Sequence, residues 1–494
     1  MSIIKQKLSG IPEGSAALFF IQIFATLGFA ILYSTLVLYA TKKLHFSVKE
    51  ATAIMGVFGA FNYGLHLFGG YLGGRFISNR NLFVGGMVLQ VLGCACISGG
   101  TVMQLYWGLA LFLTGSGLNV TCINMMLTQR FTPEDNRREG AFLWNYAGMN
   151  LGFFIGFSAA GYYQLQEDYP SLFIFATIGN FISIVLAAVY WKTLKDRNTP
   201  LSLSTPTEFK KKMLVGLAVL FGLVPVVFYM LHQAESTAQI ILAIGGLVAL
   251  TLIYLTVTHA DLRERRNMSA YLVFTAGNVV FWTLYQMAPT GLQLFTVSNV
   301  DRIVMGVEIA PQWIQNINTF VIVFGGPLMA MWFNQLRAKG WNIDVSVQFA
   351  TALVLIGIGF LVLPLGIMLA PENGMVTFKW IFISYVFQSI GELLISPVGY
   401  AMIGRLAPAK YQGVMMGTWM LATGIASILS SDFSGMVPEA SDGLPIVTNP
   451  TYSHVFGMLG WGSVAVGIVL YALMPLMRRL ITSGPANDQQ AEVL

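Results

Sequence analysis

One carboxylate, Glu392, lies well inside an apolar stretch, in the sequence FQSIGELLISPVGYAMIGRLAP from residue 387 to residue 408. A charged side chain at the centre of a bilayer costs roughly 2.5–3.5 kcal/mol on insertion scales, so such a residue usually faces a cavity or a partner. Glu392 is therefore a candidate counter-charge for a cationic group of a substrate, or a candidate proton carrier. The alternative is a structural carboxyl group that joins two helices through hydrogen bonds.

The composition of the chain indicates that this carboxylate lies in a membrane. Of the 494 residues, 55% are hydrophobic and only 10% are charged, and the mean hydropathy is +0.68. These values are typical of a multi-span membrane protein. The apolar runs continue for about 20 residues, which predicts spanning helices and not barrel strands. The net charge of +5 does not indicate a nucleic-acid partner.

Fourteen apolar segments are long enough to span the bilayer. An even number puts both termini on one side, and 22 of the 27 lysines and arginines fall on that side. The positive-inside rule then predicts that both termini are cytoplasmic and that the chain is a multi-pass protein of the cell inner membrane. The segments are 16–40, 50–73, 82–100, 103–128, 141–163, 171–191, 213–232, 237–258, 270–294, 313–335, 345–370, 378–401, 412–432 and 455–477.

The longest basic linkers flank the seventh and eighth segments. This predicts an all-α membrane protein of the major facilitator fold, with a six-helix bundle at 1–191, an inserted helix pair with basic linkers at 192–268 and a second six-helix bundle at 269–494. Transporters with this plan bind their substrate near the membrane midplane, between the halves. A transporter is the leading class, and a channel, a membrane enzyme or a receptor are the alternatives.

The stretch around Glu392, followed by YQGVMMGTWMLATGIAS, resembles the proton-dependent oligopeptide transporter family. Four further stretches resemble it too: GGYLGGRFISNR, NRREGAFLWNYAGMNLGFFIG, VFWTLYQMAPTGLQLF and PQWIQNINTFVIVFGGPLMAMW. The inserted helix pair is also a feature of bacterial members. The resemblance implies a central peptide cavity in which Glu392 holds the amino terminus of the peptide. It also implies that Asn318, Asn150, Tyr63 and Trp419 line or gate that cavity.

The charged residues of the family's N-terminal half are absent from this chain. The family has a first-span Glu-x-x-Glu-Arg cluster, a second arginine along that span, a fourth-span lysine, a seventh-span acid, and an acid and a proline in the second span. The matching positions are Gln22, Ala25, Thr26, Tyr33, Val120, Gln286, Gly74 and His66. Losing one member of a buried ion pair strands the other, at a cost of about 3–5 kcal/mol. Replacing all the charged residues together leaves no charge without a partner, which indicates a rebuilt site.

Two hypotheses follow from this rebuilt site. With no cation in the spans to receive a peptide carboxylate, Gln22, Tyr33, Asn119 and Gln286 are candidate hydrogen-bonding residues for neutral or amidated groups. The substrate is then a peptide, a peptide-like conjugate or a cationic small molecule. Proton coupling needs a group that titrates, and Glu392 and His66 are the candidates inside the spans. Coupling through Glu392 alone and transport without coupling are both open.

Several of these polar residues also have purely structural explanations. Gln22 and Gln286 could join helices by hydrogen bonds, while Tyr33, Tyr63 and His66 could be packing residues. Trp419 could be an interfacial anchor. By contrast, Gln315 and Asn318 lie one turn apart on one helical face, which favours a cavity lining.

No zinc spacing, nucleophile elbow or phosphate-binding loop is present in the sequence, so we expect no enzyme activity, no metal and no cofactor. The main prediction is a secondary transporter that imports di- or tripeptides or peptide-like compounds by alternating access, with altered proton-coupling residues. We expect a single chain to be the functional unit. The alternatives are a carrier of a non-peptide cation or metal-chelating metabolite, and a transport-inactive sensor or assembly subunit on the same scaffold.

Overall fold

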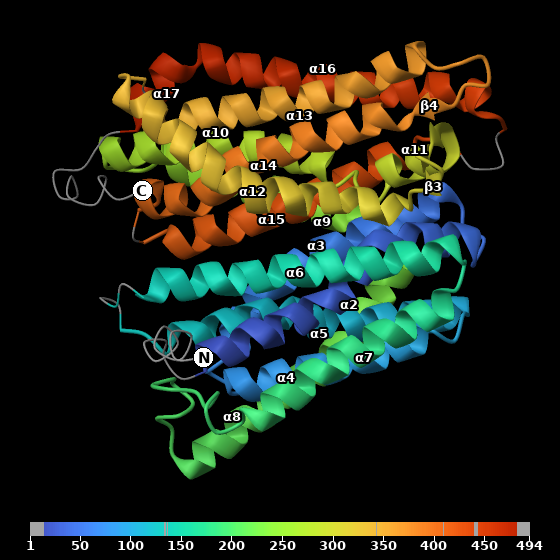
Figure 1. Ribbon diagram of the computed structural model, residues 1–494. Helices are drawn as coiled ribbons and strands as arrows, with labels where there is room; N and C mark the ends of the chain where they lie inside the picture. The colour runs from blue at the N-terminus through green and yellow to red at the C-terminus, as the bar shows by residue number, and fades with distance from the viewer. Residues whose placement is uncertain are drawn as a thin grey trace, which may run out of the picture.

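The computed structural model describes residues 14–132, 135, 137–341, 343–408, 410–438 and 443–481. Long helices dominate it (Figure 1). The helices are α2 (Ser15–Lys42), α3 (Val48–Leu72), α4 (Asn79–Ile97), α5 (Val102–Thr128), α6 (Arg137–Leu165), α7 (Tyr169–Val189), α8 (Pro206–His232), α9 (Ala234–Val257), α10 (Leu262–Tyr285), α11 (Gly291–Asn299), α12 (Pro311–Ala338), α13 (Val345–Met368), α14 (Phe378–Leu406), α15 (Gln412–Ser434), α16 (Pro445–Ala472) and α17 (Met474–Leu480). The strands are β1 (Val300–Asp301), β2 (Ile303–Val304), β3 (Val307–Glu308) and β4 (Val376–Thr377).

The predicted all-α membrane architecture is confirmed. Thirteen of the described helices are long and apolar enough to cross a membrane. The helix that covers the fifth predicted segment, α6, is 29 residues long and packs against α2. Twelve of the fourteen predicted segments therefore fall on one long helix each.

The ninth predicted segment, 270–294, is not one continuous helix. The helix α10 ends at Tyr285, five residues of turn follow, and the short helix α11 begins at Gly291. Pro289 lies in this turn and disfavours helical conformation at the residue before it. The last predicted segment also differs, because α16 begins at Pro445 and is followed by a separate short helix, α17.

The long helices form two groups that lie one above the other in Figure 1. The helices α4, α5 and α7 pack together with α2, α3 and α6, while α13 packs against α10, α14 and α16 in the other group. The two groups meet where α3 packs against α15 and where α6 packs against α12. The beginning of α2 and the end of α17 lie at the same end of the helices (Figure 1).

The inserted helices α8 and α9 diverge and do not form a closely packed hairpin. A single residue, Gln233, separates them, after which α8 packs against α5 and α3, and α9 packs against α3, α15 and α10. Of these two helices, α9 packs against members of both helix groups, and α8 packs against members of one. At its start, the Glu235 carboxylate forms an exposed ion pair with Lys49 of α3, with 2.9 Å between Lys49 Nζ and Glu235 Oε1.

The two helix groups are joined by hydrogen bonds at the end opposite to the start of α2, which we call the distal end. Gln293 Nε2 donates to the carbonyl of Ser34 at 2.5 Å, and the Ser431 hydroxyl donates to the carbonyl of Thr52. Between α6 and α12, further bonds run from Trp313 Nε1 to the carbonyl of Ser158 (2.9 Å), from Asn316 Nδ2 to Ser158 Oγ (3.1 Å) and from Gln312 Nε2 to Gln164 Oε1 (3.1 Å). The molecule is therefore closed at the distal end.

Candidate functional site

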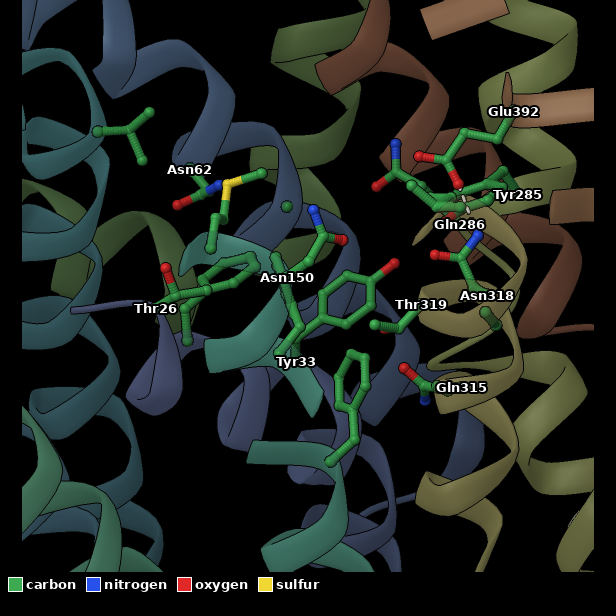
Figure 2. A pocket seen from close by; sticks show the side chains of 18 of the residues that line it. Thr26, Tyr33, Asn62, Asn150, Tyr285, Gln286, Gln315, Asn318, Thr319 and Glu392 are labelled. Atoms are coloured by element: carbon green, nitrogen blue, oxygen red, sulfur yellow. Dashed lines mark hydrogen bonds between the residues drawn. The ribbon is translucent and has the colours of Figure 1, made fainter. Parts of the chain in front are cut away.

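A cavity of about 320 Å³ lies between the two helix groups. This volume is at the small end of the range for sites that bind small molecules. Its walls come from α2, α3, α4, α5 and α6 on one side and from α10, α12 and α14 on the other. Figure 2 shows both walls, with Thr26 and Asn62 on the first and Asn318 and Glu392 on the second.

Glu392 lies on the wall formed by α14 and faces this cavity (Figure 2). Asn318 Nδ2 donates a hydrogen bond of 2.6 Å to Glu392 Oε2 and a second one, of 3.2 Å, to Ser389 Oγ. The Tyr285 hydroxyl also hydrogen-bonds to the Glu392 carboxylate. These partners are uncharged, so α10 and α12 hold the carboxyl group in place without a counter-ion among the described residues.

Helical spacing places the other groups of this wall on the cavity side. Gln315, Asn318 and Thr319 of α12 line the cavity, and positions three and four residues apart share one helical face. On α14, the cavity-lining residues Ser389 and Glu392 are also three residues apart. Gln315 is only 4% exposed, and its side-chain nitrogen has no hydrogen-bond partner among the described residues.

The wall formed by the N-terminal helices includes, beside apolar side chains, neutral polar groups that bond to one another. Gln22 Nε2 donates to Thr26 Oγ1 at 2.9 Å, and the Gln22 side-chain oxygen accepts from Asn145 Nδ2 at 3.4 Å. Ser116 Oγ donates to Asn62 Oδ1 at 3.3 Å. These short networks order the wall without introducing a charge.

Further predicted site residues also line the cavity. Asn150 Nδ2 donates to the carbonyl of Tyr146, one turn earlier on α6, at 3.0 Å. Gln286 Nε2 donates to the carbonyl of Thr423 at 3.0 Å, which ties the turn after α10 to α15. The remaining predicted residues on the cavity wall are Tyr33, Tyr63, His66 and Asn119.

Trp419 is not part of this wall. Its side chain is only 4% exposed, and its ring packs against Tyr271 and Phe349, with ring centroids 6.2 Å and 6.1 Å apart. It is buried among α10, α13 and α15 because these helices pack around an aromatic cluster. Trp419 therefore does not line the cavity, and a gating role for it stays a prediction.

Several aromatic residues of the cavity were not predicted from the sequence. Tyr146, Tyr285 and Tyr385 all line it, as do Phe153 and Trp282. Two of the tyrosines carry a recognisable signal: Tyr146 lies four residues before Asn150, and Tyr385 lies seven residues before Glu392. Residues at these spacings share a helical face, so Tyr146 and Tyr385 could have been inferred from Asn150 and Glu392.

Glu392 is the only aspartate, glutamate, lysine or arginine among the cavity-lining residues of the described chain. The imidazole of His66 also lines the cavity. Within the same described residues, no cluster of three His, Cys, Asp or Glu side chains could hold a metal ion. The chemistry of the cavity therefore centres on one carboxylate among neutral amides, hydroxyls and aromatic rings.

Comparison with known proteins gives consistent results. A model of the POT family matches residues 75–449. The chain is 29% identical to dipeptide and tripeptide permease A of Cronobacter turicensis, over 95% of this chain and 93% of the relative. It is 27% identical to the permease of the same name from Escherichia coli, over 97% of this chain and 95% of the relative. A crystal structure of a peptide transporter POT in complex with sulfate superposes with a TM-score of 0.84, at 24% identity and 96% coverage of both chains. This likeness shows the predicted major facilitator fold.

Proposed function

The chain belongs to the POT family, and we propose that it is an inner-membrane secondary transporter that imports di- or tripeptides or peptide-like compounds. The observation that carries this proposal is the single carboxylate, Glu392, on the wall of a central cavity between two helix bundles. Support comes from relatives that are dipeptide and tripeptide permeases and that match nearly the whole chain.

The amino group of the substrate binds at Glu392. A protonated amine has three N–H donors. The Glu392 carboxylate accepts one of them, and Asn318, whose nitrogen is already bonded to Glu392, offers its side-chain oxygen to a second. Tyr285 keeps the carboxylate oriented, because its hydroxyl bonds to the same group. A charge-assisted hydrogen bond of this kind is about twice as strong as a neutral one.

The substrate crosses by alternating access between the two bundles. The distal end of this conformation is closed by hydrogen bonds from α11, α12 and α15 to α2, α3 and α6. The positive-inside rule places both termini in the cytoplasm. This conformation is then closed to the outside. Movement of the two bundles apart at the distal end opens the cavity to the outside.

Proton symport requires that a proton and the substrate are bound at the same time. A proton and an ammonium group compete for the Glu392 carboxylate, so Glu392 alone would support exchange and not symport. His66 on α3 supplies a second site in the same cavity, and its Nε2 atom is buried without a hydrogen-bond partner in the described chain. We therefore assign the amine to Glu392 and the co-transported proton to His66.

Uptake into proteoliposomes tests the binding role. The substrates are the dipeptide Ala-Ala and its C-terminal amide. The outcome then does not depend on whether the C-terminal group of the substrate is a carboxylate or an amide. We expect Glu392→Gln to lower uptake of whichever compound is carried by at least about 30-fold, which corresponds to roughly 2 kcal/mol. The control is Glu235→Gln, the same chemical change at the exposed ion pair outside the cavity.

Two results of this experiment would contradict the proposal. Unchanged uptake by Glu392→Gln would exclude the carboxylate as the amine site, and a transport-inactive chain would show no uptake of either compound even without a substitution. The coupling role is measured separately with His66→Gln. This variant should lose the response of uptake to an imposed pH gradient while it still exchanges internal for external substrate.

A further inference from the structure

The charged side chains of the cavity are of one sign only in the described chain. Its lining contains the Glu392 carboxylate but, in the part of the chain that the structure describes, neither a lysine nor an arginine. A dipeptide with free ends has an ammonium group at one end and a carboxylate at the other. The cavity therefore offers an ionic partner to the first end but not to the second.

The far end of a ligand held at Glu392 would meet neutral groups. The wall across the cavity carries the side-chain amides of Gln22, Asn62 and Asn150 and the hydroxyl of Ser116 (Figure 2 labels Asn62 and Asn150). On the near wall, the side-chain amide of Gln315 also lines the cavity (Figure 2). Such groups satisfy the carbonyl and N–H of an amide.

Aromatic rings reinforce the preference for a cation. Tyr33, Tyr146 and Tyr385 line the same cavity as Glu392, and so do Trp282 and Tyr285, whose ring centroids are 5.1 Å apart. The faces of such rings attract an ammonium group and offer no attraction to an anion. A free carboxylate would have to leave water for this space without a counter-ion, which is costly for a buried charge.

We propose that this transporter selects compounds that carry an amine at one end and no carboxylate at the other. The class includes dipeptide amides, dipeptide esters and amine-bearing conjugates of similar size. This inference rests on the proposed function, because it assumes that the cavity is the substrate site. It differs from the proposed function by excluding ordinary dipeptides as the preferred substrates.

Matched ligands test this selection. The purified full-length protein is titrated with Ala-Phe, Ala-Phe-amide and N-acetyl-Ala-Phe-amide, and binding is measured by thermal shift and by competition for uptake. We expect the amide to bind at least tenfold more tightly than the free dipeptide, and the acetylated amide not to bind. Equal binding of the amide and the free dipeptide would overturn the selection while leaving the proposed function intact.

Other outcomes of the same titration are equally decisive. Equal binding of the acetylated amide would overturn the requirement for an amine. Absence of binding and uptake for all three compounds would overturn both the selection and the proposed function.

A gain of charge provides a second, independent test. Val120 of α5 lines the cavity on the N-terminal side. The substitution Val120→Lys supplies the missing cation, and Val120→Met is a control of similar length without charge. We expect Val120→Lys to shift the ratio of free dipeptide binding to amide binding at least tenfold toward the free dipeptide, relative to Val120→Met. The same ratio in both variants, in protein that melts as cooperatively as the unmodified chain, would contradict the proposal.

Discussion

Substitution of Gly161 by alanine should open the distal end of the transporter. Gly161 lies near the end of α6, where α12 begins opposite to it. A Cβ atom at this position would lie 2.8 Å from the Cβ of Ala310 and closer still to the indole of Trp313. The Ala310 Cβ cannot rotate away, and the indole is fixed by its hydrogen bond to the Ser158 carbonyl. The two helices therefore have to separate.

The size of the effect follows from two contributions to the closed conformation. Overpacking of a well-packed contact costs about 1–3 kcal/mol, and a displaced Trp313 would also lose a hydrogen bond with a net value of about 0.5–1.5 kcal/mol. A conformation in which the helices have separated is free of both penalties. A combined shift of about 2 kcal/mol changes the ratio of closed to open molecules about 30-fold.

Pulsed EPR measures this ratio directly. Spin labels at Gln166, just after α6, and at Met305, which is fully exposed in the loop between β2 and β3, report the distance across the distal end. We expect Gly161→Ala to add a population with a longer distance. The control is Gly462→Ala in α16, where a Cβ atom would meet no other atom within 4 Å.

One result would refute this reasoning. If Gly161→Ala and Gly462→Ala gave the same narrow distance distribution, the contact between α6 and α12 would not hold the distal end closed. A general loss of stability would not explain a broadened distribution, because alanine favours a helix over glycine by about 1 kcal/mol.

Two further predictions concern the loops at the other end of the helices. Asp196 Oδ2 accepts hydrogen bonds from the backbone nitrogen and Nδ2 of Asn79, at 2.8 Å and 3.0 Å, at the start of α4. We expect Asp196→Ala to destabilise the protein by about 1–3 kcal/mol and Asp196→Asn by less, measured by thermal unfolding, and equal losses would argue against a charge-assisted cap. Arg137 donates hydrogen bonds to Asp135 and lowers the pKa of that carboxyl to about 2. The stabilisation is present above the unfolded pKa near 3.8 and is lost only as the pH falls toward 2. Asp135→Asn should therefore leave the pH profile of uptake between about pH 5 and 8 unchanged, and a shifted profile would show that this pair takes part in coupling.

The sequence was most informative at residue types whose burial in a membrane carries a high free-energy cost. A glutamate in an apolar run has few explanations, so Glu392 could be assigned to a cavity from the sequence alone. Gln315 and Asn318 could be assigned with it because helical spacing fixes a shared face. The long apolar runs likewise indicated where the spanning helices lie, since bilayer thickness sets their length.

Residue types that suit both packing and binding could not be assigned in this way. Tyr285 and Trp282 bring apolar surface together with a polar group, so their positions depend on how α10 rotates against its neighbours. Trp419 has the same ambiguity and lies in the packed interior. The divergence of α8 and α9 depends on contacts with α5, α3 and α15, which are distant in sequence.

The hydrogen bonds at the distal end connect uncharged groups: amides, hydroxyls, an indole and backbone carbonyls. Dissolved ions shield charged pairs over a distance of about 10 Å at 0.1 M ionic strength, but they have little influence on contacts of this kind. We therefore expect the closed state of the distal end to change little with the ionic strength of the surrounding solution.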